Sequence, residues 1–304
     1  RFRTISFLSD YGTEDEFVGV VKSVVRTLSP ATAVIDITHA IEPHDVRAGG
    51  LALARSVQYL APGVVLAVVD PGVGTERRPV AIEVAGGEAY LVGPDNGLLA
   101  PAVSMVGGAT GAFVLDNGDY HLPAPGPTFG GRDVFGPVAA HLCNGVPAHE
   151  LGTSIDPGLL LPGVLPVSER AEDGSIAAEI LWIDRFGNAQ LNVDPDELAD
   201  WPEAVTVGGG RTDRTAQRVA TYAHIPTGSI GLVVDSYGLM SVAVDRASAA
   251  EDLDLHVGQE ITLTPAPGRS GVSVPVQLGA RPSVTPPEEF CEVQGPGEHV
   301  EERS

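Results

Sequence analysis

Three aspartates stand where apolar stretches of the N-terminal half give way to glycine-containing segments. They are Asp10, Asp70 and Asp95. Ligands of an α/β sheet bind beyond the carboxyl ends of its strands, where a carboxylate can hold a hydroxyl or ammonium group. One such aspartate alone is more often a helix cap or a turn former. Three at equivalent strand ends favour a ligand site.

The residues after Asp70 indicate what kind of ligand to expect. The glycines within 72–74 are not followed by the Gly-Lys-Ser/Thr of a Walker A loop, and Arg77 leads into a strand rather than a helix. A mononucleotide phosphate site is therefore disfavoured. Asp70 with Arg77 in reach can instead orient a polar reactant, because a carboxylate and a guanidinium form strong, directional hydrogen bonds. The alternative is an ion pair that only closes the loop.

Two turn segments of the C-terminal half carry groups that suit a nucleoside. In the segment 184–188, Phe186 could stack on a base and the Asn188 amide could pair with a purine edge. The alternative is a β-turn with a core phenylalanine. The segment 236–238, which contains Tyr237, fits either a hairpin turn or a ligand-binding loop.

The elements that must position these groups divide into two kinds. Up to about residue 165, strand and helix patterns alternate, which predicts an α/β domain with a largely parallel sheet. We expect strands at 5–8, 33–37, 64–69, 80–84 and 89–92, and helices at 16–28 and 46–60.

A Pro- and Leu-rich linker at 157–166 ends the helical pattern. Short strands separated by turn signals then predict a smaller all-β unit, a barrel or a compact sandwich. We expect these strands at 176–183, 189–193, 204–207, 231–234, 240–244 and 260–263. The predicted domains are therefore 1–165 and 166–270, followed by an acidic, mobile tail at 271–304.

The charge balance limits the possible partners. The chain has 40 acidic and 18 basic residues, a formal net charge of −22, which disfavours nucleic acid and anionic membranes. Lys22 is the only lysine, which fits a coding bias towards arginine or tolerance of high salt.

Cysteine and histidine usage indicates the compartment and disfavours a metal site. Two distant cysteines, Cys143 and Cys291, suggest a reducing compartment, so we expect a cytoplasmic protein. We expect no metal site, because no histidine or cysteine cluster has ligand spacing; His141 and His149 suit surface or packing positions.

Six segments spread over roughly residues 3–265 carry a family resemblance. They are FLSDYG at 7–12, VDPGVGT at 69–75, GPDNG at 93–97, TFGGRD at 128–133, DRFGN at 184–188 and DSYG at 235–238. Together they resemble the S-adenosyl-L-methionine (SAM) hydrolases that form adenosine, also called SAM hydroxide adenosyltransferases. That family is related to the SAM-dependent fluorinase and chlorinase.

The resemblance implies an N-terminal α/β domain, a C-terminal β-barrel and a homotrimer with active sites at subunit interfaces. It also implies attack of water or hydroxide on C5′ of the SAM ribose, a displacement that releases L-methionine and leaves adenosine. SAM is then the substrate, and neither a cofactor nor a metal is expected.

The resemblance also assigns substrate-binding roles to residues of this sequence. Asp10 is expected to bind the ribose diol, Asp15 the methionine ammonium and Ser236 its carboxylate. Three residues are expected to hold the adenine: Phe186, Asn188 and Tyr222. The remaining expected binding positions are His44, which would pack on the nucleoside, and Gly131, Asp184 and Tyr237 within the matching motifs.

Gly130 is the one departure within these motifs. The hydrolases position the nucleophilic water with an Asp-Arg-His set, whose first two members match Asp70 and Arg77, whereas Gly130 stands at the histidine position. Glycine has no side chain that can accept a proton. Either the site is disarmed, or a pocket water or another residue replaces the imidazole, with His121 and His44 as candidates.

Gly130 keeps two other functions open. Gly130 and Gly131 would leave room for a halide, as in a SAM-dependent halogenase such as the chlorinase. Asp70 argues against this, because two like unit charges ~4 Å apart repel by about 4 kcal/mol at an effective dielectric of about 20. The other alternative is a non-catalytic protein that binds SAM or adenosine.

Overall fold

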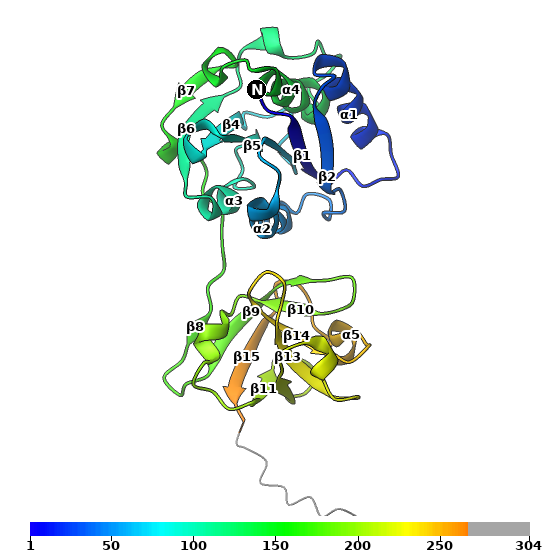
Figure 1. The fold of residues 1–304 in the computed structure, drawn as a ribbon, viewed down its shortest axis with the longest axis vertical. Helices are drawn as coiled ribbons and strands as arrows, with labels where there is room; N and C mark the ends of the chain where they lie inside the picture. The colour runs from blue at the N-terminus through cyan, green and yellow to red at the C-terminus, as the bar shows by residue number, and fades with distance from the viewer. Residues whose placement is uncertain (267–304) are drawn as a thin grey trace, which may run out of the picture. The chain divides into compact units, whose positions relative to one another are not determined.

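A computed structural model describes residues 1–266 of the chain (Figure 1). The first part is a seven-stranded sheet with strand order β2-β1-β3-β5-β4-β6-β7. Its strands are β1 (Thr4–Ser9), β2 (Ala33–Thr38), β3 (Val64–Val68), β4 (Pro79–Val84), β5 (Ala89–Pro94), β6 (Ala109–Val114) and β7 (Thr153–Ile155). Strands β2, β1, β3 and β5 are parallel, and β4, β6 and β7 extend the sheet in antiparallel pairing. The predicted α/β class is confirmed.

Helices cover both faces of this sheet. They are α1 (Phe17–Leu28), α2 (Val46–Ser56), α3 (Ala100–Met105) and α4 (Gly136–Asn144). Alternation along β1 sends Ile5 and Phe7 into a core with α1 and α4, and sends Leu8 into a second core with α2 and α3. Strand β3 is buried along its whole length, as its unbroken apolar run predicts.

The second part is a closed β-barrel rather than a sandwich. The ring runs β10-β14-β13-β12-β11-β15-β9 and closes where β9 pairs with β10, while β8 adds to β9 outside the ring. The strands are β8 (Glu169–Arg170), β9 (Ile176–Ile183), β10 (Ala189–Leu191), β11 (Ala204–Gly208), β12 (Arg214–Arg218), β13 (Ile230–Val234), β14 (Met240–Val244) and β15 (Glu260–Pro265), with helix α5 at Ala249–Leu253. Its apolar core is a separate cluster that includes Leu191 and Leu263.

Short turns of helix join these elements. They are Val57–Tyr59, Ala85–Gly87, Gly118–Tyr120, Gly131–Phe135, Ala148–Glu150, Pro157–Leu159, Pro195–Leu198 and Tyr222–His224. The helix expected at 46–60 therefore ends earlier, with a tight 3₁₀ turn as its last part. The predicted domain boundary near 165 lies in the segment between Leu159 and β8, which has no regular structure. The tail expected at 271–304 lies outside the described residues.

None of the helices in residues 1–266 is both long and apolar enough to cross a membrane.

Candidate active site

The loop after β1 places the first predicted binding residue. The Asp10 Oδ2 atom accepts a hydrogen bond from the backbone N–H of His44, at 2.9 Å. Gly12 has a φ of +66° and its N–H donates to the carbonyl of His39, at 2.8 Å. The structure thus brings the backbone of His44 to Asp10, whereas Asp15 lies exposed in the approach to α1.

The predicted pairing of Asp70 with Arg77 is present in the structure. Arg77 Nε donates to Asp70 Oδ1 at 3.0 Å, and Nη2 donates to the other carboxylate oxygen. Both side chains are largely buried, with 5% of the Asp70 side chain and 14% of that of Arg77 exposed. Burial raises the pKa of Asp70, and the nearby Asp10 adds to the rise, while Arg77 opposes it. Within the described residues Arg77 Nη1 is buried without a hydrogen-bond partner, so one donor at this site is left for another group.

Gly130 and Gly131 differ in the room that they offer a side chain. A Cβ built on Gly130 would lie 3.1 Å from the edge of the Phe135 ring, a contact that a small ring movement relieves. A Cβ on Gly131 would lie 2.4 Å from the hydroxyl of Tyr11, so this position needs glycine as long as Tyr11 stays in place. Gly131 also begins a wide π-type turn, Gly131–Phe135, a kind of turn that is frequent at functional sites.

Tyr11 is a site residue that the sequence analysis missed. Its ring packs edge-on against Phe7 and Phe129, and its hydroxyl lies against Gly131. Burial raises the pKa of Tyr11, and the charges of Asp10 and Asp70 raise it further. The phenol therefore stays protonated and can act as a hydrogen-bond donor. Its position directly after Asp10 was the signal that could have revealed it.

Strand pairing explains why these groups meet. β1 and β3 are adjacent and parallel, with Ser9 opposite Val68, so their carboxyl ends lie side by side. Asp10 follows the first strand directly, and Asp70 follows the second after one residue. Two of the three aspartates singled out by sequence thus share one site.

The third aspartate has a structural role. Asp95 is buried, pairs with Arg78, and accepts a hydrogen bond from the backbone N–H of Leu161 at 2.8 Å. It therefore fastens the segment before β8 to the end of β5. Asn96 supports the same corner, because its side-chain amide donates to the carbonyl of Val69 at 2.9 Å.

The two histidines considered as replacements for an imidazole at Gly130 lie in different surroundings. His44 has a φ of 70° and contributes its backbone N–H to Asp10. His121 is half-buried and close enough to Asp116 to feel its charge, and burial lowers the pKa of this imidazole. The replacement role of either side chain stays a prediction.

The remaining predicted residues gather at one end of the barrel. A cavity of about 640 Å³ is lined by residues that include Asp184, Phe186, Asn188, Tyr222 and Ser236. A neighbouring cavity of about 300 Å³ shares these five and adds Tyr237. Burial raises the pKa of Tyr222, with Asp235 and Asp184 adding to the rise, so its hydroxyl stays protonated.

The two loops beside these cavities are built in the same way. Asp184 Oδ1 accepts the backbone N–H groups of Phe186 and Asn188, at 2.8 and 2.9 Å, and Oδ2 accepts from the Asn188 amide at 2.8 Å. Asp184 therefore holds Phe186 and Asn188 in position, and the side-chain Oδ1 atom of Asn188 can accept from a ligand, whereas its backbone carbonyl accepts the Asp184 N–H at 3.0 Å.

Asp235 repeats the pattern in the second loop. Its Oδ1 accepts the N–H groups of Tyr237 and Leu239, at 2.8 and 3.2 Å, and its Oδ2 accepts from the Gln190 amide at 2.5 Å. Both loops are thus held from within by one carboxylate.

Known proteins share this architecture and these sequences. Residues 5–152 match the SAM hydroxide adenosyltransferase N-terminal domain and residues 178–262 match its C-terminal domain. A Salinispora tropica protein named (R)-S-adenosyl-L-methionine hydrolase is 42% identical over 86% of this chain and 97% of its own. A fluorinase from Actinopolyspora mzabensis is 26% identical over 86% of this chain and 96% of its own.

A solved structure agrees with the sequence matches. The crystal structure of an uncharacterized conserved protein from Thermotoga maritima superposes with a TM-score of 0.79, at 31% identity, over 85% of this chain and 99% of that one. The likeness extends over both domains and over nearly the full length of these relatives. The chain therefore belongs to the SAM hydroxide adenosyltransferase family.

Proposed function

We propose that this protein hydrolyses SAM to adenosine and L-methionine, by attack of water or hydroxide on C5′ of the ribose. The observation that carries the proposal is the buried Asp70–Arg77 pair beside Asp10 and Tyr11. The sulfonium is already a good leaving group, so no acid is needed for methionine to depart. The protein must desolvate one water and aim it in line with the C5′–S bond, and fixed polar groups in a buried site suit that task.

The residues divide between water and substrate. Asp70 accepts a proton of the water, Arg77 holds the carboxylate in place, and Tyr11 donates a hydrogen bond nearby. Asp10 binds the ribose diol, and Asp15 and Ser236 bind the ammonium and carboxylate of the methionine part. Because the Salinispora tropica relative is named for the (R) form of SAM, we also infer selectivity for that configuration at sulfur.

Two remaining elements of the proposal are the assembly and the compartment. In a single chain 76% of Phe186 and 43% of Tyr222 are exposed, although both are assigned to adenine. A neighbouring subunit that covers this face would supply the dry surroundings that stacking needs. We propose that this neighbour belongs to the homotrimer with interfacial sites that the family resemblance implies. We place the protein in the cytoplasm, in keeping with its cysteine usage.

Incubation with SAM tests the activity itself. The expected product is adenosine, formed in equal amount to L-methionine, with and without chloride, as measured by liquid chromatography. The (R) form of SAM should be consumed and the (S) form left. Chloride-dependent 5′-chloro-5′-deoxyadenosine would instead establish a halogenase. Bound SAM without any product over long incubation would establish a binding protein.

Restoring an imidazole at position 130 should accelerate hydrolysis. We expect Gly130→His to raise kcat by about tenfold or more, since positioned acid–base groups contribute roughly 10²–10⁴-fold. Gly130→Ala is the matched control, because it adds the Cβ near Phe135 without the imidazole. A Gly130→His rate no higher than that of Gly130→Ala would contradict the water-orienting role of this position.

The role of Asp70 predicts a pH dependence. Burial raises the pKa of Asp70 above its ordinary value, so activity should fall on acidification sooner than an exposed aspartate would require. Protonation removes the acceptor for the water. Asp70→Asn should lower kcat by about 100-fold and abolish this acid limb of the pH–rate profile. An acid limb that persists unshifted in Asp70→Asn would assign it to another group.

The proposed assembly predicts a particle of three chains. Light scattering coupled to size exclusion should give three times the mass of one chain. Phe186→Ala, which removes an exposed aromatic of the proposed interfacial site, should weaken adenosine binding. A monomeric wild-type protein with full activity would overturn the trimer while leaving the hydrolase proposal intact.

A further inference from the structure

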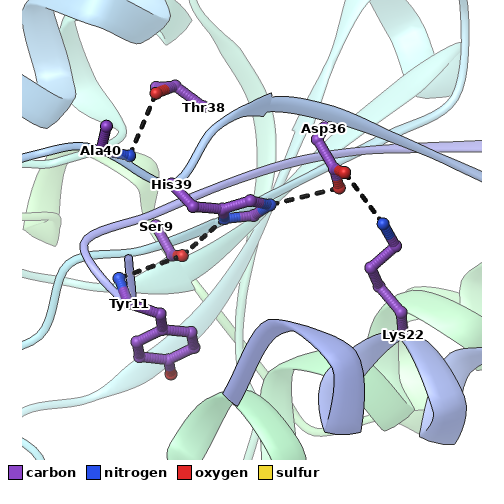
Figure 2. A network of polar contacts seen from close by, with 7 residues as sticks. All are labelled: Ser9, Tyr11, Lys22, Asp36, Thr38, His39 and Ala40. Atoms are coloured by element: carbon purple, nitrogen blue, oxygen red, sulfur yellow. Dashed lines mark hydrogen bonds and ion pairs between the residues drawn. The ribbon is translucent and has the colours of Figure 1, made fainter. Parts of the chain in front are cut away.

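A buried histidine outside the proposed site is connected to the loop that carries Asp10. Figure 2 shows the contacts that join Tyr11, Ser9, His39, Asp36 and Lys22. The Tyr11 N–H donates to Ser9 Oγ at 3.3 Å, and Ser9 Oγ lies 2.7 Å from His39 Nδ1. His39 Nε2 lies 3.2 Å from one oxygen of Asp36, whose other oxygen accepts from Lys22 at 2.8 Å. Ser9 is fully buried and His39 is 6% exposed.

The chemistry of these groups favours one direction for the hydrogen bonds. An ionised Asp36 can only accept, so the tautomer that suits this contact carries its proton on Nε2, which lies 3.2 Å from Asp36 but makes no hydrogen bond of good geometry within the described residues. Nδ1 is then an acceptor, and Ser9 must donate its hydroxyl proton to it. The Ser9 oxygen remains free to accept the Tyr11 N–H. Tyr11 thus donates to Ser9 and Ser9 to His39, while Nε2 of His39 faces Asp36, whose carboxylate pairs with Lys22.

The same three residue types form the nucleophilic triad of many hydrolases, but this set cannot work in that way. Ser9 has no exposed surface on which a substrate could reach its oxygen, and that oxygen already accepts the Tyr11 N–H. The arrangement is therefore one that holds the backbone in place.

His39 contacts the Asp10 loop at two points, one before and one after Asp10 in the chain. Through its ring it holds Ser9, the residue before Asp10, and through its carbonyl it accepts the N–H of Gly12, at 2.8 Å. The ring itself is fixed against Phe7, with centroids 4.6 Å apart. Moving the imidazole would therefore remove one of the two bonds that hold the backbone of Asp10 and Tyr11.

We propose that His39, acting through Ser9, is a positioning residue that sets Asp10 and Tyr11 for the nucleoside. This inference rests on the proposed function, since Asp10 is taken to bind the ribose diol. Misplacement of a binding group by about 1 Å can cost about 10²-fold in rate, so a loop held from two sides has a direct catalytic value. The bond that matters is the one between Ser9 and Nδ1; the contact with Asp36 fixes the tautomer of the ring.

Two substitutions at His39 separate these contacts. The amide oxygen of His39→Asn falls near the place of Nδ1 and can still accept from Ser9, whereas the longer amide of His39→Gln reaches the place of Nε2 and serves only Asp36. We expect kcat/KM for SAM in His39→Gln to be about tenfold or more below that in His39→Asn. Adenosine affinity, measured by calorimetry, should fall in the same order, with similar melting temperatures for the two variants.

The controls distinguish positioning from stability. His141 is half-buried, packs on Tyr120 and lies outside this network, so His141→Asn and His141→Gln should show no such split. Should His39→Gln not fold, Ser9→Ala removes the same link while keeping the imidazole, and should reproduce the loss. Equal rates and equal adenosine affinities for His39→Asn and His39→Gln would overturn the proposal. A wild-type protein that forms no adenosine would overturn the hydrolase function instead, and the adenosine affinities would still test His39.

Discussion

The site depends on how a buried carboxylate, Asp70, is kept charged beside a second carboxylate, Asp10. The parallel pairing of β1 with β3 brings both groups to one edge of the sheet, and burial raises the pKa of Asp70. Arg77 supplies the counter-charge through two hydrogen bonds. Removing one member of such a buried pair costs about 3–5 kcal/mol, because the other is left uncompensated. The loop 70–77 therefore forms a turn and also places the positive charge of Arg77 beside Asp70. In the proposed mechanism the same negative charge disfavours a halide and suits a water that must give up a proton.

Gly130 and Gly131 are under different steric constraints. The Tyr11 hydroxyl occupies the space that a Cβ of residue 131 would need. Position 130 has a helical backbone conformation, and a Cβ there would approach only side-chain atoms of Phe135 and Val73, which can adjust. At the level of the Cβ, the fold therefore does not require glycine at 130. Tyr11 already supplies a neutral hydrogen-bond donor near Asp70. In the proposed mechanism, a residue at 130 would therefore have less to contribute to orienting the water.

Much of the architecture could be read from the sequence, and the exceptions have physical causes. Apolar runs such as 64–68 predict buried strands directly, because burial on both faces removes the need for polar alternation. Strand β12 was not expected, since Arg214–Arg218 buries only Ala216 and is placed by pairing with its neighbours. Asp95 has the same sequence context as Asp70 but ends in a structural ion pair with Arg78. Its partner Leu161 lies far away in the chain, and spacing alone does not reveal such a contact. The position of Tyr11 beside Gly131 was missed for a similar reason, because the contact between its hydroxyl and Gly131 joins residues far apart in the chain.

The two halves of the protein hold their aspartates with different partners: a guanidinium cation holds Asp70, whereas neutral N–H groups of backbone and amides hold Asp184 and Asp235. Asp184 and Asp235 spend both carboxylate oxygens on hydrogen bonds within or beside their own loops. These two carboxylates stabilise the loops at the barrel end. A ligand there would contact the aromatic and amide groups of these loops. Asp70 also has both oxygens bonded, but to one guanidinium, whose Nη1 has no hydrogen-bond partner within the described residues, and Asp10 accepts one backbone N–H of His44. In the α/β domain Arg77 therefore has a donor left for another group, while the barrel end presents aromatic and amide groups. The proposed reaction would use both sets of groups, since the nucleoside must be bound firmly and attacked at one carbon.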